Sequence, residues 1–230
     1  MKDPNRYGAD GCTPFHKAIL ANDFSLVKQL LQAGASVNLR VRGGHVNAGY
    51  SALHLAVEAA HKCDTLALLT AIVTAPNVQI DSTVDDATRR TCLHIVGLSG
   101  DVAAAELLRA QGAQFDVLDA QRHTPLDLAA NAERVDMVQY LLDRLATSSA
   151  GLRDKVFRNQ DSSGDSAFHH AVKAQNQRLF NYNYPLRDAQ YNISYMLARA
   201  GLDANLSNVD GDSAVDLMPE PLAQLVDGMV

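Results

Sequence analysis

The chain has 230 residues, of which 47% are hydrophobic and 20% are charged, a balance typical of a globular protein with a buried core. Its formal net charge of −6 argues against non-specific binding to nucleic acid, which requires a basic surface. No apolar run reaches the roughly 18 residues of a membrane span, and the N-terminus lacks the apolar core of a signal peptide. The three cysteines show no framework spacing, so we expect reduced thiols in the cytoplasm or nucleus.

A short phrase of six residues recurs along the chain, and such a repeat determines the architecture. Its copies begin at Thr13, Ser51, Thr91, Thr124 and Ser166, with a weaker sixth copy at Ser213. The interval between the third and fourth copies is 33 residues, and the other intervals are longer because they carry insertions. Stacked repeats offer one long surface rather than a central pocket, which favours binding over catalysis.

The first repeat unit illustrates the helices that each copy of the phrase predicts. Thr13 can cap a helix that begins with Pro14, because the hydroxyl accepts a backbone N–H and proline has no N–H to leave unpaired. Apolar residues at helical spacing predict a second amphipathic helix over 24–32, which Gly34 ends in a left-handed conformation. The fourth unit repeats this pattern, with its second helix predicted over 135–143.

The phrase resembles the T-P-L-H-x-A signature of the ankyrin repeat, a unit of about 33 residues. The first two copies read Thr13-Pro14-Phe15-His16-Lys17-Ala18 and Ser51-Ala52-Leu53-His54-Leu55-Ala56. The resemblance implies an all-α ankyrin-repeat solenoid of stacked helix-turn-helix units with projecting β-turn fingers. We therefore predict one continuous domain over residues 1–230, with units at about 8–39, 46–81, 86–118, 119–145, 161–207 and 208–230.

Insertions depart from this pattern, and in solenoids they usually fall on one face. They lie at 39–47, 76–90, 145–160 and 177–190. We interpret the first two as solvated loops, with a partner contact as the alternative for the first. The third is a candidate flexible joint in which Leu152, Val156 and Phe157 favour a short helix. The fourth contains Tyr182 and Tyr184, which either form a contact surface or pack back onto the outer helices.

Catalytic and metal-binding motifs are not evident. One repeat position holds a histidine in four units: His16, His54, His94 and His169. These histidines lie a repeat apart, too far to share a metal ion, and the resemblance implies that they hydrogen-bond to neighbouring turns. Asp127 and Asp216 replace them in two units, and the adjacent His169 and His170 point in different directions on a helix. We therefore predict no metal, no cofactor and no enzymatic activity.

Ankyrin proteins usually bind through their finger tips and the concave side of their first helices. The resemblance thus implies these partner-binding residues: Tyr50, Glu58, Arg90, Leu98, His123, Asn131, Asp165 and Lys173. The charge pattern of the fingers adds Arg40, Arg42, Arg89 and Arg122, and the aromatic insertion adds Tyr182 and Tyr184. The early fingers are rich in arginine, which suits carboxylates and phosphates, and the late fingers are rich in aspartate. We predict that the early fingers bind an acidic segment of a partner, with Tyr50 and Leu98 as apolar anchors. A scatter of solvated charges is the alternative.

These features predict a non-catalytic scaffold that binds another protein. Narrower alternatives are an inhibitor resembling the IκB group, which masks a transcription factor, a microbial effector in a host cytosol, and a regulatory subunit that docks an enzyme. The fold alone does not separate them.

Overall fold

The computed structural model describes residues 3–63, 66–182 and 193–219. Within these residues the regular structure is helical, and the β-structure consists of isolated bridges without a sheet. This confirms the prediction of an all-α fold. The helices are α1 (Pro14–Leu20), α2 (Phe24–Gln32), α3 (Ala52–Cys63), α4 (Leu66–Val73), α5 (Cys92–Ser99), α6 (Val102–Ala110), α7 (Pro125–Asn131), α8 (Val135–Ala146), α9 (Ala150–Phe157), α10 (Ala167–Tyr182) and α11 (Ile193–Ala200).

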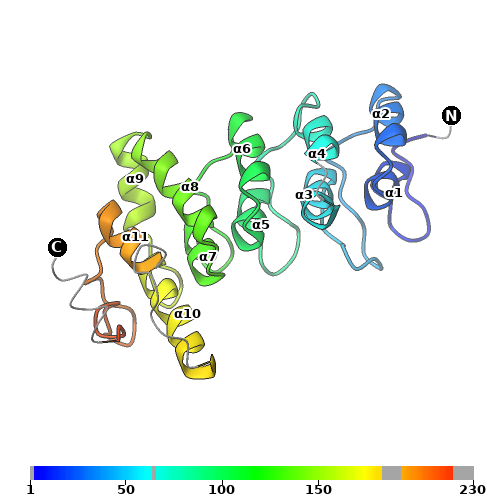
Figure 1. Cartoon of the computed structure of the whole chain (residues 1–230). Coiled ribbons are helices and arrows are strands. Elements are labelled where there is room, and N and C mark those ends of the chain that lie inside the picture. The colour runs from blue at the N-terminus through cyan, green and yellow to red at the C-terminus, as the bar shows by residue number, and fades with distance from the viewer. Residues whose placement is uncertain (1–2, 64–65, 183–192, 220–230) are drawn as a thin grey trace. The chain divides into compact units, whose positions relative to one another are not determined.

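The chain divides into two compact units, which are called the first unit and the second unit below and are distinct from the repeat units of the sequence. The first comprises residues 1–96 and 103–114, and the second comprises residues 97–102 and 115–230. In the first unit α1 packs on α2 and α3, and α3 packs on α4 (Figure 1). In the second unit α7 packs on α8 and α10, and α11 packs on both α8 and α10 (Figure 1). Each unit therefore has its own core of helix pairs.

The helix starts follow the predicted chemistry. The Thr13 side chain accepts a hydrogen bond from the His16 backbone N–H, while the His16 ring accepts one from the Thr13 N–H, and Pro14 opens α1. Thr124 and Asp127 form the same reciprocal cap at the start of α7. Caps of this kind stabilise a helix by about 1 kcal/mol, so the recurring phrase marks where α1 and α7 begin.

Large apolar side chains from both helices of a pair fill the two cores. Phe15, Ile19 and Leu69 are almost completely buried in the first unit, as are Met137 and Phe168 in the second. Burying one such side chain contributes about 1.5–3 kcal/mol. Within the described residues, no helix combines the length and apolar character needed to cross a membrane.

The fingers, defined as the loops that precede the first helices, are joined to one another by backbone hydrogen bonds within each unit. In the first unit, the Arg42 N–H donates to Gly11 O over 2.9 Å, and the Asp85 N–H donates to Gly49 O over 3.2 Å. In the second unit, the Ser162 N–H donates to Gln121 O over 2.9 Å, and the Val209 N–H donates to Ser163 O over 3.0 Å. The insertion at 39–47 is consequently tied to its neighbours at the backbone.

The later insertions differ from simple loops. Residues 150–157 of the third form α9, in which Val156 and Phe157 are buried, as the apolar spacing predicted. In the fourth, α10 continues through residue 182. The side chain of Tyr182 and the whole of Tyr184 lie outside the described residues. The sixth copy of the phrase, from Ser213, forms turns rather than a helix.

Candidate functional site

Two histidines of the recurring phrase, His16 and His169, connect their helices to the next finger. The His16 Nδ1 accepts from the Thr13 N–H, and its Nε2 donates to Leu39 O over 3.0 Å. In the second unit, the His169 Nδ1 accepts from the Ser166 N–H and its Nε2 donates to Asp212 O over 3.1 Å. This is the hydrogen-bonding role that the resemblance implies. Burial lowers the pKa of His54, which holds the same position, to about 4.

Asp127 takes this histidine position in the second unit and is fully buried. Its Oδ2 accepts hydrogen bonds from the Thr124 N–H, the Thr124 hydroxyl and the Asn159 side-chain amide. Burial raises the pKa of Asp127 to about 6, although these hydrogen bonds oppose the rise. A carboxylate cannot donate to the next finger, so Asn159 reaches back from that finger to donate instead.

In the first unit, the predicted contact residues of the second finger are partly used inside the fold. The Arg40 guanidinium donates to the carbonyls of Gly49 and Thr83. The Arg42 guanidinium lies 3.7 Å from the centre of the Tyr7 ring, although Arg42 itself is exposed. Tyr50 is half-buried, and its pKa is raised to about 12 by burial and by the nearby negative charge of Glu58. Arg42 is therefore the exposed cation of this finger.

Arg89 and Arg90 differ although they are adjacent. Arg89 is exposed and has a φ of 51°, and its backbone N–H donates to Asp86 Oδ1 over 3.1 Å. Arg90 is half-buried, with its Nε atom shielded from solvent. Of the two, Arg89 is the one that faces solvent.

In the second unit, some of the predicted partner-binding residues are exposed and others form ion pairs with each other. Asn131 and Arg122 are exposed, and Leu98 is half-buried. Lys173 pairs with Asp165 Oδ2, whose other oxygen accepts from the Asn208 amide over 3.0 Å. Lys173 and Asp165 therefore neutralise each other.

His123 does not project from the finger tip. Its Nδ1 lies 3.1 Å from Asp119 Oδ2, and its Nε2 lies 3.3 Å from Asp161 Oδ2. With a side chain only 16% exposed, this residue faces its own fold more than it faces solvent.

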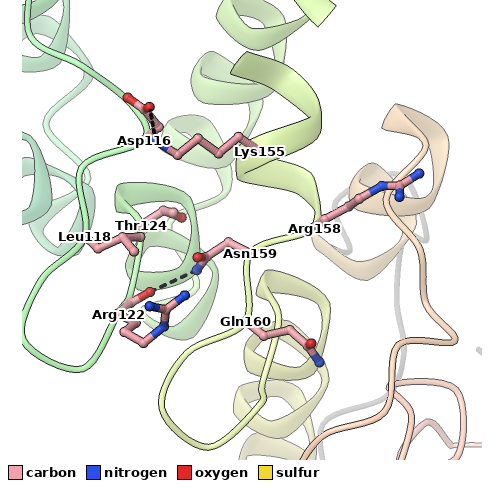
Figure 2. A pocket seen from close by; sticks show the side chains of 8 residues that line it. All are labelled: Asp116, Leu118, Arg122, Thr124, Lys155, Arg158, Asn159 and Gln160. Atoms are coloured by element: carbon pink, nitrogen blue, oxygen red, sulfur yellow. Dashed lines mark hydrogen bonds and ion pairs between the residues drawn. The ribbon is translucent and has the colours of Figure 1, made fainter. Parts of the chain in front are cut away.

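A cavity of about 300 Å³ opens in the second unit where α9 meets the fingers around it. Its lining consists of Asp116, Leu118, Arg122, Thr124, Lys155, Arg158, Asn159 and Gln160 (Figure 2). Figure 2 shows the Arg158 side chain extending away from the other lining residues and Lys155 pointing to Asp116, 2.7 Å from its Oδ2. Of these residues, only Arg122 was predicted from the sequence to bind a partner. Most of the others belong to an insertion or to repeat positions at which no partner contact was expected.

Helix pairs whose fingers are hydrogen-bonded to one another define a helical repeat protein. The family described as "Ankyrin repeats (3 copies)" matches residues 59–154 and 93–182, and the family described as "Ankyrin repeat" matches residues 10–42. The chain belongs to the ankyrin repeat family. Its repeats make it a protein–protein interaction domain, and this family and fold are typically non-catalytic.

Comparison with known proteins agrees with this assignment. The chain is 32% identical over 149 residues to the nuclear factor NF-kappa-B p105 subunit of Gallus gallus, covering 56% of this chain and 14% of that protein. It is 32% identical over 202 residues to the B-cell lymphoma 3 protein homolog of Mus musculus, covering 87% of this chain and 38% of that protein. The chain thus spans much less than the full length of these relatives. A crystal structure of an ankyrin repeat domain from Acinetobacter baumannii matches with a TM-score of 0.71 at 18% identity, covering 94% of this chain and 95% of that one, which supports the fold.

Proposed function

We propose that this chain is a non-catalytic domain that binds acidic segments of a partner protein, with Arg89 as the main contact of the first unit and Arg122 as that of the second. Both residues occupy the same position of a finger, two residues before the threonine that caps the first helix. In the other four units this position is glycine: Gly11, Gly49, Gly164 and Gly211.

The backbone at this position is left-handed in every unit. Arg89 and Arg122 have φ values of 51° and 68°, and the four glycines have φ values between 75° and 89°. A residue with a Cβ atom costs roughly 1–2 kcal/mol in this conformation. Side chains kept at such a cost cluster at functional sites, and this substitution of arginine for glycine is the observation that carries the proposal.

No ion pair of the Arg89 or Arg122 side chain within the described residues offsets this conformational cost. Both residues are exposed. An exposed guanidinium can form two parallel hydrogen bonds to a carboxylate, which gives both affinity and orientation. Arg122 also lines the cavity of the second unit, where Lys155 is already paired with Asp116. Arg42 is a further exposed cation of the first unit.

The double variant Arg89→Gly/Arg122→Gly tests this proposal, because it removes the strain and the charge together. We expect it to be more stable than the wild type by up to about 1 kcal/mol at each position, and to bind acidic peptides at least tenfold more weakly for each lost contact. Peptides selected from a displayed peptide library against the wild-type chain supply the ligands, and calorimetry compares their affinities.

The matched control is Arg6→Gln/Arg109→Gln, which removes two exposed charges outside the finger position and should leave peptide affinity unchanged. Selected peptides without an excess of Asp and Glu, or equal affinities for the wild type and the glycine variant, would contradict the proposal. Arg90 is left intact because its side chain is partly buried, so that replacing it would change stability as well as binding.

The relatives favour one narrower function over the others. The match to a nuclear factor subunit supports an IκB-like inhibitor of a transcription factor, acting in the cytoplasm or nucleus, over a microbial effector or an enzyme-docking subunit. Binding of purified NF-kappa-B to the wild-type chain, measured by the same calorimetry, tests this second candidate. A lack of binding leaves the acidic-segment proposal standing and removes this refinement.

A further inference from the structure

Three side chains with metal-binding atoms converge in the second unit: His123 from one finger, Asp161 from the next finger, and His170 from α10. The His123 Nε2 lies 3.3 Å from Asp161 Oδ2, and the His170 Nε2 lies 3.2 Å from the same oxygen. The ligand atoms of all three residues lie within 4.8 Å of one another. Their side chains are 16%, 5% and 11% exposed, so the cluster is shielded from solvent without being sealed.

The repeat fold does not require these histidines. At the position of His123 the other units have Cys12, Tyr50, Arg90, Asp165 and Asp212, and at the position of His170 they have Lys17, Leu55, Ile95, Leu128 and Leu217. Asp161 does serve the fold, since its Oδ1 accepts from the N–H groups of Ser163 and Asp165. That role uses one carboxylate oxygen, and the other oxygen faces the two imidazoles.

The distances from the Asp161 oxygen to the two imidazole nitrogens match those between ligands of a tetrahedral metal centre. With zinc–ligand distances of about 2.0–2.1 Å and tetrahedral angles, two ligand atoms lie roughly 3.3 Å apart. Both nitrogen–oxygen distances in the cluster agree with this value. The His170 Nε2 is buried and faces Asp161 Oδ2 at 3.2 Å.

An outer carboxylate orients one of the rings. Asp119 Oδ2 lies 3.1 Å from the His123 Nδ1, so the imidazole can donate to Asp119 and present its Nε2 to the cluster. Metal-binding histidines almost always have such a partner, which fixes the tautomer and orients the ring.

We propose that His123, Asp161 and His170 bind a zinc ion, with Asp119 as the carboxylate that positions His123. Two imidazole nitrogens and one carboxylate oxygen suit zinc, whereas magnesium and calcium prefer sites built from oxygen. Three protein ligands leave the fourth position for water or for a side chain of a bound partner. No metal was predicted from the sequence, because the histidines of the recurring phrase lie a repeat apart and the adjacent His169 and His170 point in different directions. The cluster instead combines three different repeat positions from two repeats.

Metal binding is tested on the untagged full chain after treatment with a chelator, by calorimetric titration with zinc. We expect one zinc ion per chain, and at least a tenfold loss of affinity in Asp161→Asn and in His170→Leu. Asp119→Asn should weaken zinc binding by about 10–100-fold, as expected for an outer partner. The control His45→Gln changes a histidine outside the cluster and should bind zinc like the wild type.

The repeats themselves indicate that the key variants fold. Asparagine already occupies the position of Asp161 in the last finger, where the Asn208 Oδ1 accepts from the N–H groups of Asp210 and Asp212. Leucine occupies the position of His170 at Leu55 and Leu128. Far-UV circular dichroism confirms folding, and zinc should raise the melting temperature of the wild type but not that of these variants.

Cobalt(II) provides a readout of geometry. The wild-type chain should show the strong visible absorption of tetrahedral cobalt, and Asp161→Asn and His170→Leu should not. The proposal is overturned if the wild type binds no zinc, or if folded Asp161→Asn and His170→Leu bind zinc as tightly as the wild type. The latter result would place any bound zinc on other histidines, as an adventitious ion only.

Discussion

Gly49→Ala is expected to lower the free energy of unfolding by about 3 kcal/mol, because the substitution combines backbone strain with a steric clash. Gly49 has a φ of 87°, and a Cβ atom at this position would lie 2.5 Å from the carbonyl oxygen of Asp85 in the next finger. The oxygen belongs to the backbone, so it cannot move away without displacing the finger. Urea denaturation followed by circular dichroism measures the change.

Gly34→Ala is the matched control for this variant. Gly34 has nearly the same φ, 84°, but a Cβ atom added there would meet no other atom of the described residues within 4 Å. We expect a loss of only about 1 kcal/mol from conformational strain. The difference between the two variants isolates the close approach of the fingers, and equal losses would show that this approach contributes nothing to stability.

The second large effect concerns the buried carboxyl group of Asp127. Its pKa of about 6 in the folded chain lies above the value near 3.9 of an unfolded aspartate. The folded state therefore binds more protons between these values, and the resulting stability is complete below about pH 4 and is lost as the pH rises through 6. We expect Asp127→Asn to be more stable than the wild type by roughly 2 kcal/mol at pH 7.5, and this advantage should disappear at pH 4.

Asp216 allows a direct comparison, because it holds the same repeat position and accepts the same pair of hydrogen bonds, here from the Ser213 N–H and hydroxyl. It is exposed, and those hydrogen bonds lower its pKa. Its stabilising contribution is thus present at neutral pH and is lost as the pH falls through its folded pKa. Asp216→Asn should bring no gain at pH 7.5. Thermal unfolding of both variants and the wild type between pH 4 and pH 7.5 tests the contrast, and a gain from Asp216→Asn would contradict it.

Local chemistry explains why most of the fold could be predicted from the sequence. Thr13 and Thr124 mark helix starts because a hydroxyl followed by proline satisfies the first turn. The apolar spacing of 24–32 predicted the second helix at the bounds that the structure shows. Each of these signals involves residues within one or two turns of each other, and such signals are visible in a single chain without further information.

The candidate sites were harder to predict from the sequence, because they depend on the directions of side chains and on contacts between repeats. Sequence comparison placed Arg40 and Arg89 in one class of finger cations, but only the structure shows that Arg40 donates to backbone carbonyls while Arg89 faces solvent. The convergence of His123 and His170 on Asp161 joins residues from two successive repeats at unrelated repeat positions, for which no spacing rule exists. By contrast, aligning the fingers would have revealed arginine in place of glycine.

The backbone hydrogen bonds between successive fingers have a consequence for recognition. Each loop that they join is held in place by its neighbour before any partner arrives, since Arg42, Asp85, Ser162 and Val209 already donate their amide protons to the preceding finger. Association usually loses free energy when mobile loops must be ordered at an interface. Here that entropy is lost during folding instead, so a partner meets a preorganised template and retains more of its contact energy as affinity.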